Sequence, residues 1–129
     1  MKEIKIDERK EIWKCLSEFY LDTVLQEPDY LWIANVLKKS NLTIEELKEI
    51  DLYEVFPTLQ RNLNSVAGEW AGFNELWLMK ECTKNLKKKD NRIFRLITRF
   101  RNKRSYWMRK KHWDKMEELI GNRAESRQQ

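Results

Sequence analysis

Glycine and proline are scarce in this sequence, with three glycines and two prolines among 129 residues. Few turn-forming residues, together with abundant Leu, Glu, Lys and Arg, favour helices and argue against a β-rich protein. A chain of this length can bury a core without disulfides or metals. The composition therefore predicts an all-α protein, a compact bundle of six to seven short-to-medium helices. We expect a single domain over residues 1–121 and a polar, frayed tail over residues 122–129.

Cysteine and histidine are also scarce, with two cysteines, which form no C-x-x-C pair, and one histidine. Metal sites usually need several such ligands at short spacing, so we expect neither a metal nor another cofactor. Cys15 and Cys82 could form a disulfide, but reduced, buried thiols are the expected state. Cys82 and His112 are the only candidates for a Cys–His nucleophile pair. Both lie on helix faces that we interpret as core, so the sequence predicts a protein that is not an enzyme.

Long apolar runs are missing as well. No run approaches the ~18–20 residues that a helix needs to cross a bilayer. The first residues, Met-Lys-Glu-Ile-Lys-Ile-Asp, have no hydrophobic segment of the kind found in secretory signals. We therefore expect a cytoplasmic protein without a membrane partner.

Charge is present in quantity but is unevenly distributed. Residues 1–83 carry ten Lys or Arg and sixteen Asp or Glu, whereas residues 84–115 carry fourteen Lys or Arg and two Asp. A basic segment of this kind can attract nucleic acid or an acidic protein. It can also pack against the acidic helices of its own chain, and both interpretations remain open.

Several helix boundaries are marked by capping residues and proline. Asp7 is predicted to cap a first helix that continues to near Leu25, because Pro28 disfavours helix at the residue before it. Pro28 then opens a second helix. Asp90 is predicted to start the sixth helix. Residues 102–105 form only a weak break, so the sixth and seventh helices could be continuous.

The best-marked helix start is a T-x-x-E capping box formed by Thr43 and Glu46. Asp51 and Glu54 repeat this spacing in acidic form. We interpret their carboxylates, like those of the neighbouring glutamates, as solvated partners of positive helix N-termini. They are not interpreted as a catalytic pair.

The stretch from Val66 to Phe73 contains Gly68 and Gly72, two of the three glycines. Glycines four residues apart permit a tight corner or a close helix crossing. A structural corner is the simpler interpretation. The alternative is a ligand or partner site with Glu69 and Trp70 at its edge. The spacing does not match a phosphate-binding loop.

The basic segment is the strongest functional candidate. On a helical wheel an apolar face is formed by Ile93, Leu96, Ile97 and Phe100. Beside it runs a basic ridge formed by Arg92, Arg95, Arg99 and Lys103. Arginines of such a ridge can contact phosphates.

Trp107 lies off the apolar arc of the seventh helix and is close in sequence to Lys110 and Lys111. If exposed, it could stack on a base or on a partner side chain. The alternative is that another helix covers it. Arg109 falls inside the arc, so we expect it to snorkel or to pair with a carboxylate.

Several short motifs lie within roughly residues 9–80: Leu21-Asp22-Thr23, Ile33-Ala34, Glu54-Val55-Phe56-Pro57, Asn62-Leu63 and Val66-Ala67-Gly68-Glu69-Trp70-Ala71-Gly72-Phe73. Together they resemble the signature of a family of small bacterial all-α proteins without assigned function. The resemblance implies a small helical cytoplasmic protein without catalysis. By analogy only, such proteins are similar in size and character to immunity proteins, which bind and neutralise a toxin.

The sequence thus predicts a non-catalytic protein-binding domain, and its more specific form is an immunity or antitoxin-type protein that occludes a cognate toxin. The alternative is a nucleic-acid-binding module that uses residues 84–115. An acidic partner would contact the basic segment. A basic partner would instead contact the acidic residues Asp22, Glu45, Glu46, Glu49, Glu54 and Glu69.

Overall fold

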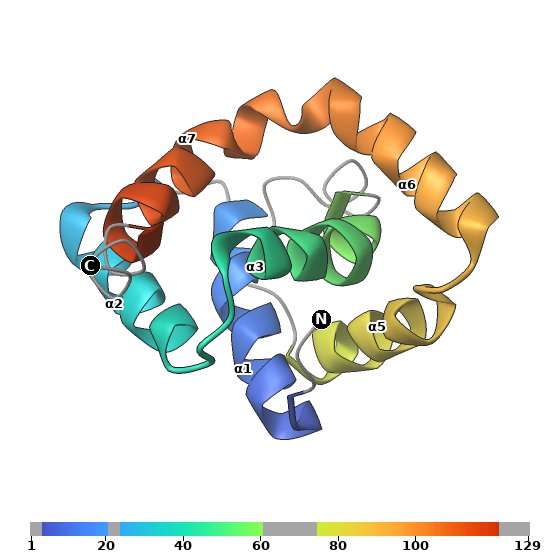
Figure 1. Ribbon diagram of the computed structural model, residues 1–129, viewed down its shortest axis with the longest axis horizontal. Helices are drawn as coiled ribbons and strands as arrows, with labels where there is room; N and C mark the ends of the chain where they lie inside the picture. The colour runs from blue at the N-terminus through green and yellow to red at the C-terminus, as the bar shows by residue number, and fades with distance from the viewer. Residues whose placement is uncertain (1–3, 21–23, 61–74, 122–129) are drawn as a thin grey trace.

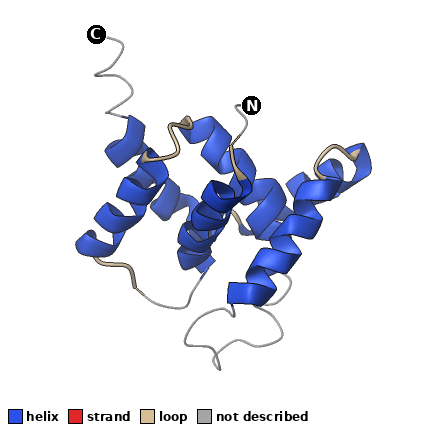
Figure 2. Cartoon of the chain, turned by 90° about the horizontal axis from the view of Figure 1, so that it is seen from below, coloured by secondary structure: helices blue, strands red, loops and turns tan. Residues whose placement is uncertain are grey.

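The computed structural model describes residues 4–20, 24–60 and 75–121 of the chain. Every regular element in these ranges is a helix, and the helices pack together, which confirms the predicted all-α bundle (Figures 1 and 2). The elements in chain order are α1 (Ile6–Ser17), the 3₁₀-helix η1 (Glu18–Tyr20), α2 (Glu27–Lys38), α3 (Ile44–Ile50), the π-helix η2 (Asp51–Val55), α5 (Glu75–Lys88), α6 (Arg92–Ser105), α7 (Trp107–Met116) and the π-helix η3 (Glu117–Gly121).

The other helices are arranged around α3 and η2. Figure 1 shows α3 at the centre of the view, with α6 and α7 forming an arch along the upper edge and α2 and α5 on opposite sides. Residues 56–60 are helical and follow η2 directly. None of the helices in the described ranges is long and apolar enough to cross a membrane.

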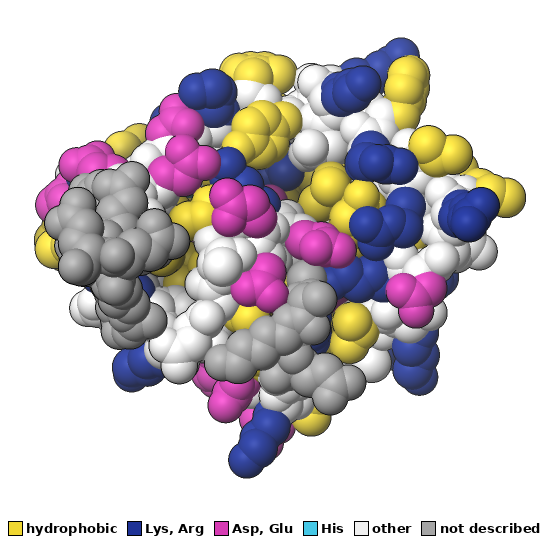
Figure 3. Space-filling view, in the orientation of Figure 1, with side chains coloured by type: hydrophobic (Ala, Val, Ile, Leu, Met, Phe, Trp, Pro, Cys, Tyr) yellow, Lys and Arg dark blue, Asp and Glu magenta, His cyan; other side chains and the backbone are white. Residues whose placement is uncertain are grey.

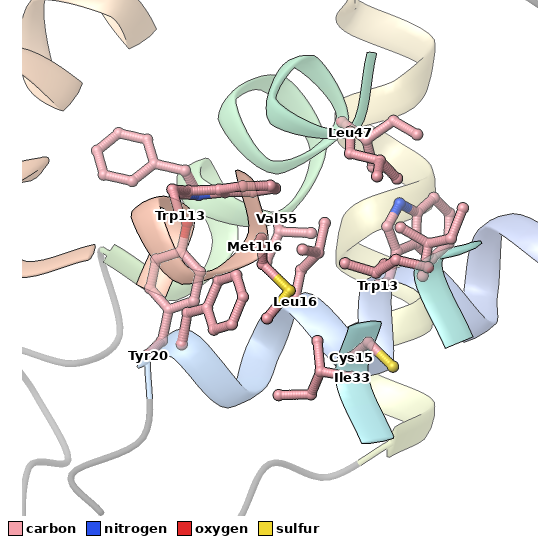
Figure 4. Close-up of a cluster of buried hydrophobic side chains, with 14 of the residues drawn as sticks. Trp13, Cys15, Leu16, Tyr20, Ile33, Leu47, Val55, Trp113 and Met116 are labelled. Atoms are coloured by element: carbon pink, nitrogen blue, oxygen red, sulfur yellow. The ribbon is translucent and has the colours of Figure 1, made fainter. Parts of the chain in front are cut away.

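The core is built by α1, α2, the α3–η2 segment, α5 and α7. Trp13 of α1 and Trp113 of α7 are both fully buried, and Leu16, Leu47 and Met116 pack with them (Figure 4). Apolar spacing along each of these helices places its buried residues on one stripe. The helix α6 contributes little to this core, because Thr98 is its only buried residue.

Of two predicted helix starts, one is confirmed and the other is wrong by one residue. The capping box is confirmed, since Thr43 Oγ1 accepts from the Glu46 amide at 3.1 Å and Glu46 Oε1 accepts from the Thr43 amide at 3.0 Å. The prediction that Asp90 starts α6 is wrong by one residue. Asn91 caps this helix instead, and its Oδ1 accepts from the Phe94 amide at 3.0 Å.

The predicted first helix is too long and begins at the wrong residue. Lys5 is the N-cap, so Asp7 lies inside the first turn, where its charge still suits the helix dipole. The α-helix ends at Ser17 and tightens into η1. This turn buries Phe19 and Tyr20, and the Tyr20 hydroxyl donates to Asp51 Oδ1 at 2.6 Å. The α-helix therefore ends well before Pro28, and the turn that follows it makes this tertiary contact.

The weak break predicted over residues 102–105 is misplaced, because those residues are helical and the interruption between α6 and α7 is a single later residue. Tyr106 separates α6 from α7, and its amide still donates to the Asn102 carbonyl at 2.7 Å. The Lys110 amide donates to the Tyr106 carbonyl at 2.9 Å. The two helices therefore form an almost continuous arch.

Candidate functional site

The apolar face of α6 points away from the core. We call this exposed set, with two residues of α7, the outer stripe, and it comprises Ile93, Leu96, Ile97, Phe100, Trp107 and Met108. These side chains are between 48% and 73% exposed. At 1.5 Å per residue, the stripe runs for about 20 Å from Ile93 to Trp107. Because exposed apolar side chains gathered on one face are a feature of interaction surfaces, the outer stripe is the candidate binding surface.

Cations flank the outer stripe, and one of them, Arg104, lies within it. We call the exposed set the basic rim, and it comprises Arg92, Arg99, Arg101, Lys103, Arg104, Lys110 and Lys111. At 100° per residue, Arg92, Arg99 and Lys103 share one edge of the stripe, and Arg101 lies on the opposite edge. Figure 3 shows basic side chains gathered on the side of the molecule that carries α6, with hydrophobic side chains between them, and acidic side chains over the centre and left.

The face of α6 that turns inward is polar. Thr98 is buried, and Asn102 accepts a hydrogen bond from Arg109 Nη2 at 2.7 Å. Arg95 also points toward α3 and η2, where its guanidinium lies 4.1 Å from the centre of the Tyr53 ring and 3.6 Å from Glu49 Oε1. The inward face of α6 is therefore attached by polar and cation–π contacts rather than by apolar packing.

Glu54 of η2 is a buried anion that joins three parts of the chain. Arg9 Nη1 lies 2.8 Å from both of its carboxylate oxygens, Trp13 Nε1 donates to Oε1 at 2.9 Å, and Lys89 Nζ donates to Oε2 at 2.7 Å. The Glu54 side chain is fully buried. The prediction that Glu54 is a solvated carboxylate, available to a basic partner, is therefore wrong.

Asp51 forms a second buried anion, one turn before Glu54. Its Oδ2 accepts from Arg109 Nε and from Trp113 Nε1, each at 3.2 Å. Arg109 also lies 5.0 Å from the centre of the Tyr20 ring. Burial and the neighbouring Asp51 carboxylate raise the pKa of Tyr20, so its hydroxyl stays protonated and donates to Asp51. The prediction of a solvated Asp51 is wrong, whereas the expected pairing of Arg109 with a carboxylate is confirmed.

The predicted partner-binding residues have different positions in the structure. Glu69 and Trp70, with Gly68 and Gly72, lie outside the described residues, as does the predicted tail 122–129. Trp107 is 73% exposed, so the interpretation that another helix covers it is wrong.

The predicted basic ridge is divided. Arg92, Arg99 and Lys103 are exposed in the basic rim, whereas Arg95 is half-buried and already engaged with Glu49, Tyr53 and the Lys89 carbonyl. On α7, the structure brings Lys110 and Lys111 into the same rim, and Lys110 Nζ also lies 2.8 Å from Asp114 Oδ2.

The outer stripe is the candidate surface that the sequence interpretation missed. The helical wheel groups Ile93, Leu96, Ile97 and Phe100 correctly on one face, but it does not indicate which face turns inward. The residues on the opposite face of α6 do indicate which face turns inward. Arg95 lies there with Thr98 and Asn102, and these side chains suit contact with the acidic α3–η2 segment.

The candidate nucleophile and base are both buried and held in the core. Burial raises the pKa of the Cys82 thiol, so the thiolate is disfavoured. His112 Nδ1 lies 2.7 Å from the Tyr30 hydroxyl, and its ring stacks on Phe19 with centroids 5.0 Å apart. Burial, with Lys111 and Arg109 nearby, lowers the pKa of His112 to about 4. These environments suit packing rather than nucleophilic chemistry.

Two further features bear on ligands. Among residues 4–20, 24–60 and 75–121, no group of three or more His, Cys, Asp or Glu is arranged to hold a metal ion. A hollow of about 220 Å³ lies where η2 meets the arch and is lined by Lys48, Asp51, Leu52, Asn102, Tyr106, Arg109 and Trp113. Its charged groups are engaged with protein partners, since Asp51 pairs with Arg109 and Lys48 with Glu117.

Comparison with known proteins places the chain in a family but gives no activity. A search of curated proteins found no match, and a search of solved structures found none either. One family profile, described as Domain of unknown function (DUF7079), matches residues 7–119. This match covers most of the chain, from the first turn of α1 to the end of α7. The chain therefore belongs to the DUF7079 family.

Proposed function

We propose that this protein is a non-catalytic protein-binding domain whose binding surface is the outer stripe with its basic rim. The observation that carries this proposal is the orientation of α6, which turns Ile93, Leu96, Ile97 and Phe100 toward solvent. Covering such side chains releases about 25 cal/mol for each Å² of apolar surface, so a partner that covers them gains affinity. The more specific form of the proposal is an immunity or antitoxin-type protein that neutralises a toxin by occlusion.

The charge distribution supports an acidic partner rather than a basic one. Among the six acidic residues suggested for a basic partner, Glu54 is buried, Glu49 pairs with Arg95 and Glu46 caps Thr43, whereas Glu45 is exposed. Asp22 and Glu69 lie outside the described residues. In contrast, all seven cations of the basic rim are exposed. Opposite charges across an interface accelerate association and select the partner.

Nucleic-acid binding through residues 84–115 is the second candidate. Trp107 supports it, because an exposed indole beside Lys110 and Lys111 can stack on a base while the lysines contact phosphates. The aliphatic side chains of Ile93, Leu96 and Ile97 argue against it. They have no aromatic face to offer a base, and phosphates would not cover them.

The test is a pull-down from the native host with the tagged full chain, treated with nuclease and eluted over a salt gradient. Wild type is compared with Phe100→Asp, with the pair Arg92→Glu and Arg99→Glu, and with Trp32→Asp. Trp32 is the matched control, since it is a 54% exposed aromatic residue on α2, far from α6 in Figure 1.

We expect one stoichiometric protein that survives nuclease, is lost with Phe100→Asp and is retained with Trp32→Asp. Recovery of nucleic acid that elutes at moderate salt and depends on Arg92 and Arg99 would support the second candidate instead. Capture that is indifferent to Phe100→Asp would refute the assignment of the binding surface.

A further inference from the structure

We infer that the partner presents an apolar groove about 20 Å long, edged on both sides by Asp and Glu, into which α6 lies lengthwise. This inference rests on the proposed protein-binding function and specifies the chemistry of the partner. Three features of the outer stripe and its basic rim lead to it: their shape, their charge and the position of Arg104.

The shape of the surface is that of a single protruding helix. Thr98 and Asn102 face the body of the protein, while Ile93, Ile97 and Phe100 project from the opposite side of α6. The arch lies at the outer edge of the molecule (Figure 1). A helix that presents residues at positions i, i+4 and i+7 is convex, so its complement is a concave groove.

The charge of the rim determines what lines that groove. Lys110 pairs with Asp114. Within the described part of the chain, no carboxylate lies within ion-pair distance of the remaining rim cations Arg92, Arg99, Arg101, Lys103, Arg104 and Lys111. Desolvating these cations against a partner is costly unless the partner supplies anions. Because Arg99 and Arg101 lie on opposite edges of the stripe, both walls of the groove must be acidic.

The same charge argues against a second copy of this chain as the occupant. Two outer stripes packed face to face would bring two basic rims together, and juxtaposed like charges oppose association. A groove in a different, acidic protein avoids this repulsion.

Arg104 argues against an anionic lipid surface. It lies within the stripe, between Phe100 and Trp107, and its guanidinium is 5.0 Å from the centre of the Phe100 ring. If α6 lay flat on a bilayer, this cation would be directed toward hydrocarbon together with its apolar neighbours. A fixed carboxylate at the floor of a protein groove would pair with Arg104 while the neighbours stay buried.

The test is photo-crosslinking in cells of the native host with the full chain. Photoreactive p-benzoylphenylalanine replaces Phe100 in one variant and Trp32 in the matched control. Crosslinked products are separated, and the labelled segment is identified by mass spectrometry. We expect the Phe100 variant, but not the Trp32 variant, to label one protein at an apolar segment flanked by Asp and Glu.

A charge exchange then tests the acidic walls. Adding Arg99→Glu and Lys103→Glu is expected to lower the crosslinking yield at least about tenfold, since like charges would now face each other. Replacing the partner's flanking carboxylates by Lys is expected to restore the yield. Circular dichroism of each variant checks that the exposed substitutions leave the fold intact.

The outcomes separate this inference from the proposed function. Labelling of a protein from Phe100 at a segment without flanking carboxylates would overturn the acidic groove but leave protein binding through the outer stripe standing. Labelling of a protein from Trp32 alone would overturn both the groove and the assigned surface, and would leave only protein binding itself standing. Labelling of lipid, nucleic acid, a second copy or the chain itself from Phe100 would overturn the groove and the assigned surface. Failure of both positions to label any protein would overturn the proposed function as well.

Discussion

Replacing Glu54 by glutamine should cost the protein much of its stability. The substitution keeps the size of the side chain but removes its charge. In the native structure this charge is shared by the Arg9 guanidinium and the Lys89 ammonium, at 2.8 and 2.7 Å. Trp13 Nε1 donates to the same carboxylate at 2.9 Å, and an amide oxygen could still accept this hydrogen bond.

The magnitude follows from the two cations that would remain. The Arg9 side chain is 10% exposed and that of Lys89 is 13% exposed, so neither can hydrate fully without local rearrangement. Breaking a buried ion pair by removing one partner typically costs about 3–5 kcal/mol. Because glutamine keeps the packing and the Trp13 hydrogen bond, we expect a loss of about 3 kcal/mol, near the lower end of that range.

Urea unfolding followed by circular dichroism measures this loss, with the slope of the transition checked for two-state behaviour. Glu117→Gln is the matched control, since it removes an exposed carboxylate that lies 2.6 Å from Lys48 Nζ. The exposed pair should contribute less than about 1 kcal/mol. If Glu54→Gln and Glu117→Gln lower the free energy of unfolding equally, the buried ion cluster is not what stabilises η2.

Three further predictions concern the core and its boundaries. The pKa of His112, lowered from 6.5 to about 4 in the folded state, means that the unfolded chain binds the proton first as the pH falls. The free energy of unfolding should therefore decrease as pH falls from 6.5 toward 4. Since the chain has one histidine, His112→Gln should flatten this dependence above pH 5. Urea titrations at successive pH values measure both. Burial, with Glu11 and Glu18 nearby, raises the pKa of Cys15 to about 12, and Cys82 is fully buried. Ellman's reagent at neutral pH should therefore react slowly with both thiols in the native protein and rapidly in urea. Fast labelling of the native protein would contradict the buried positions. Thr43→Ala should lower the free energy of unfolding by about 1 kcal/mol through loss of the α3 capping box, and an unchanged urea midpoint would show that the cap is redundant.

Local signals in the sequence identify those elements whose stability is local. The capping box at Thr43 and Glu46 needs only residues three apart, so its prediction is confirmed in the structure. The α-helical class likewise follows from composition. The end of α1 does not, because the turn after it buries Phe19 and Tyr20 against residues that are distant in the sequence, such as Asp51.

The acidic residues of η2 show that one spacing of carboxylates suits both a solvated helix start and a buried ion cluster. Asp51 and Glu54 have the spacing of a capping box, and helix-terminal solvation is the usual environment of such carboxylates. Their partners Arg9, Lys89 and Arg109 come from three other parts of the chain. Only the fold brings these cations to η2, so burial of the two anions could not be predicted from the sequence.

The orientation of α6 follows from the same ion pairs. Three cations attach α6 and its flanking residues to carboxylates of the continuous α3–η2 segment. Lys89, before α6, pairs with Glu54, and Arg95, near the start of α6, pairs with Glu49. Arg109, after the end of α6, pairs with Asp51. An amphipathic helix normally turns its apolar stripe inward because burial of that stripe stabilises the fold. Here the cations face the acidic centre of the bundle, and geometry then leaves the apolar face of α6 outside. The buried charges and the exposed apolar stripe are thus two consequences of one arrangement, which makes the outer stripe an intrinsic feature of the folded protein.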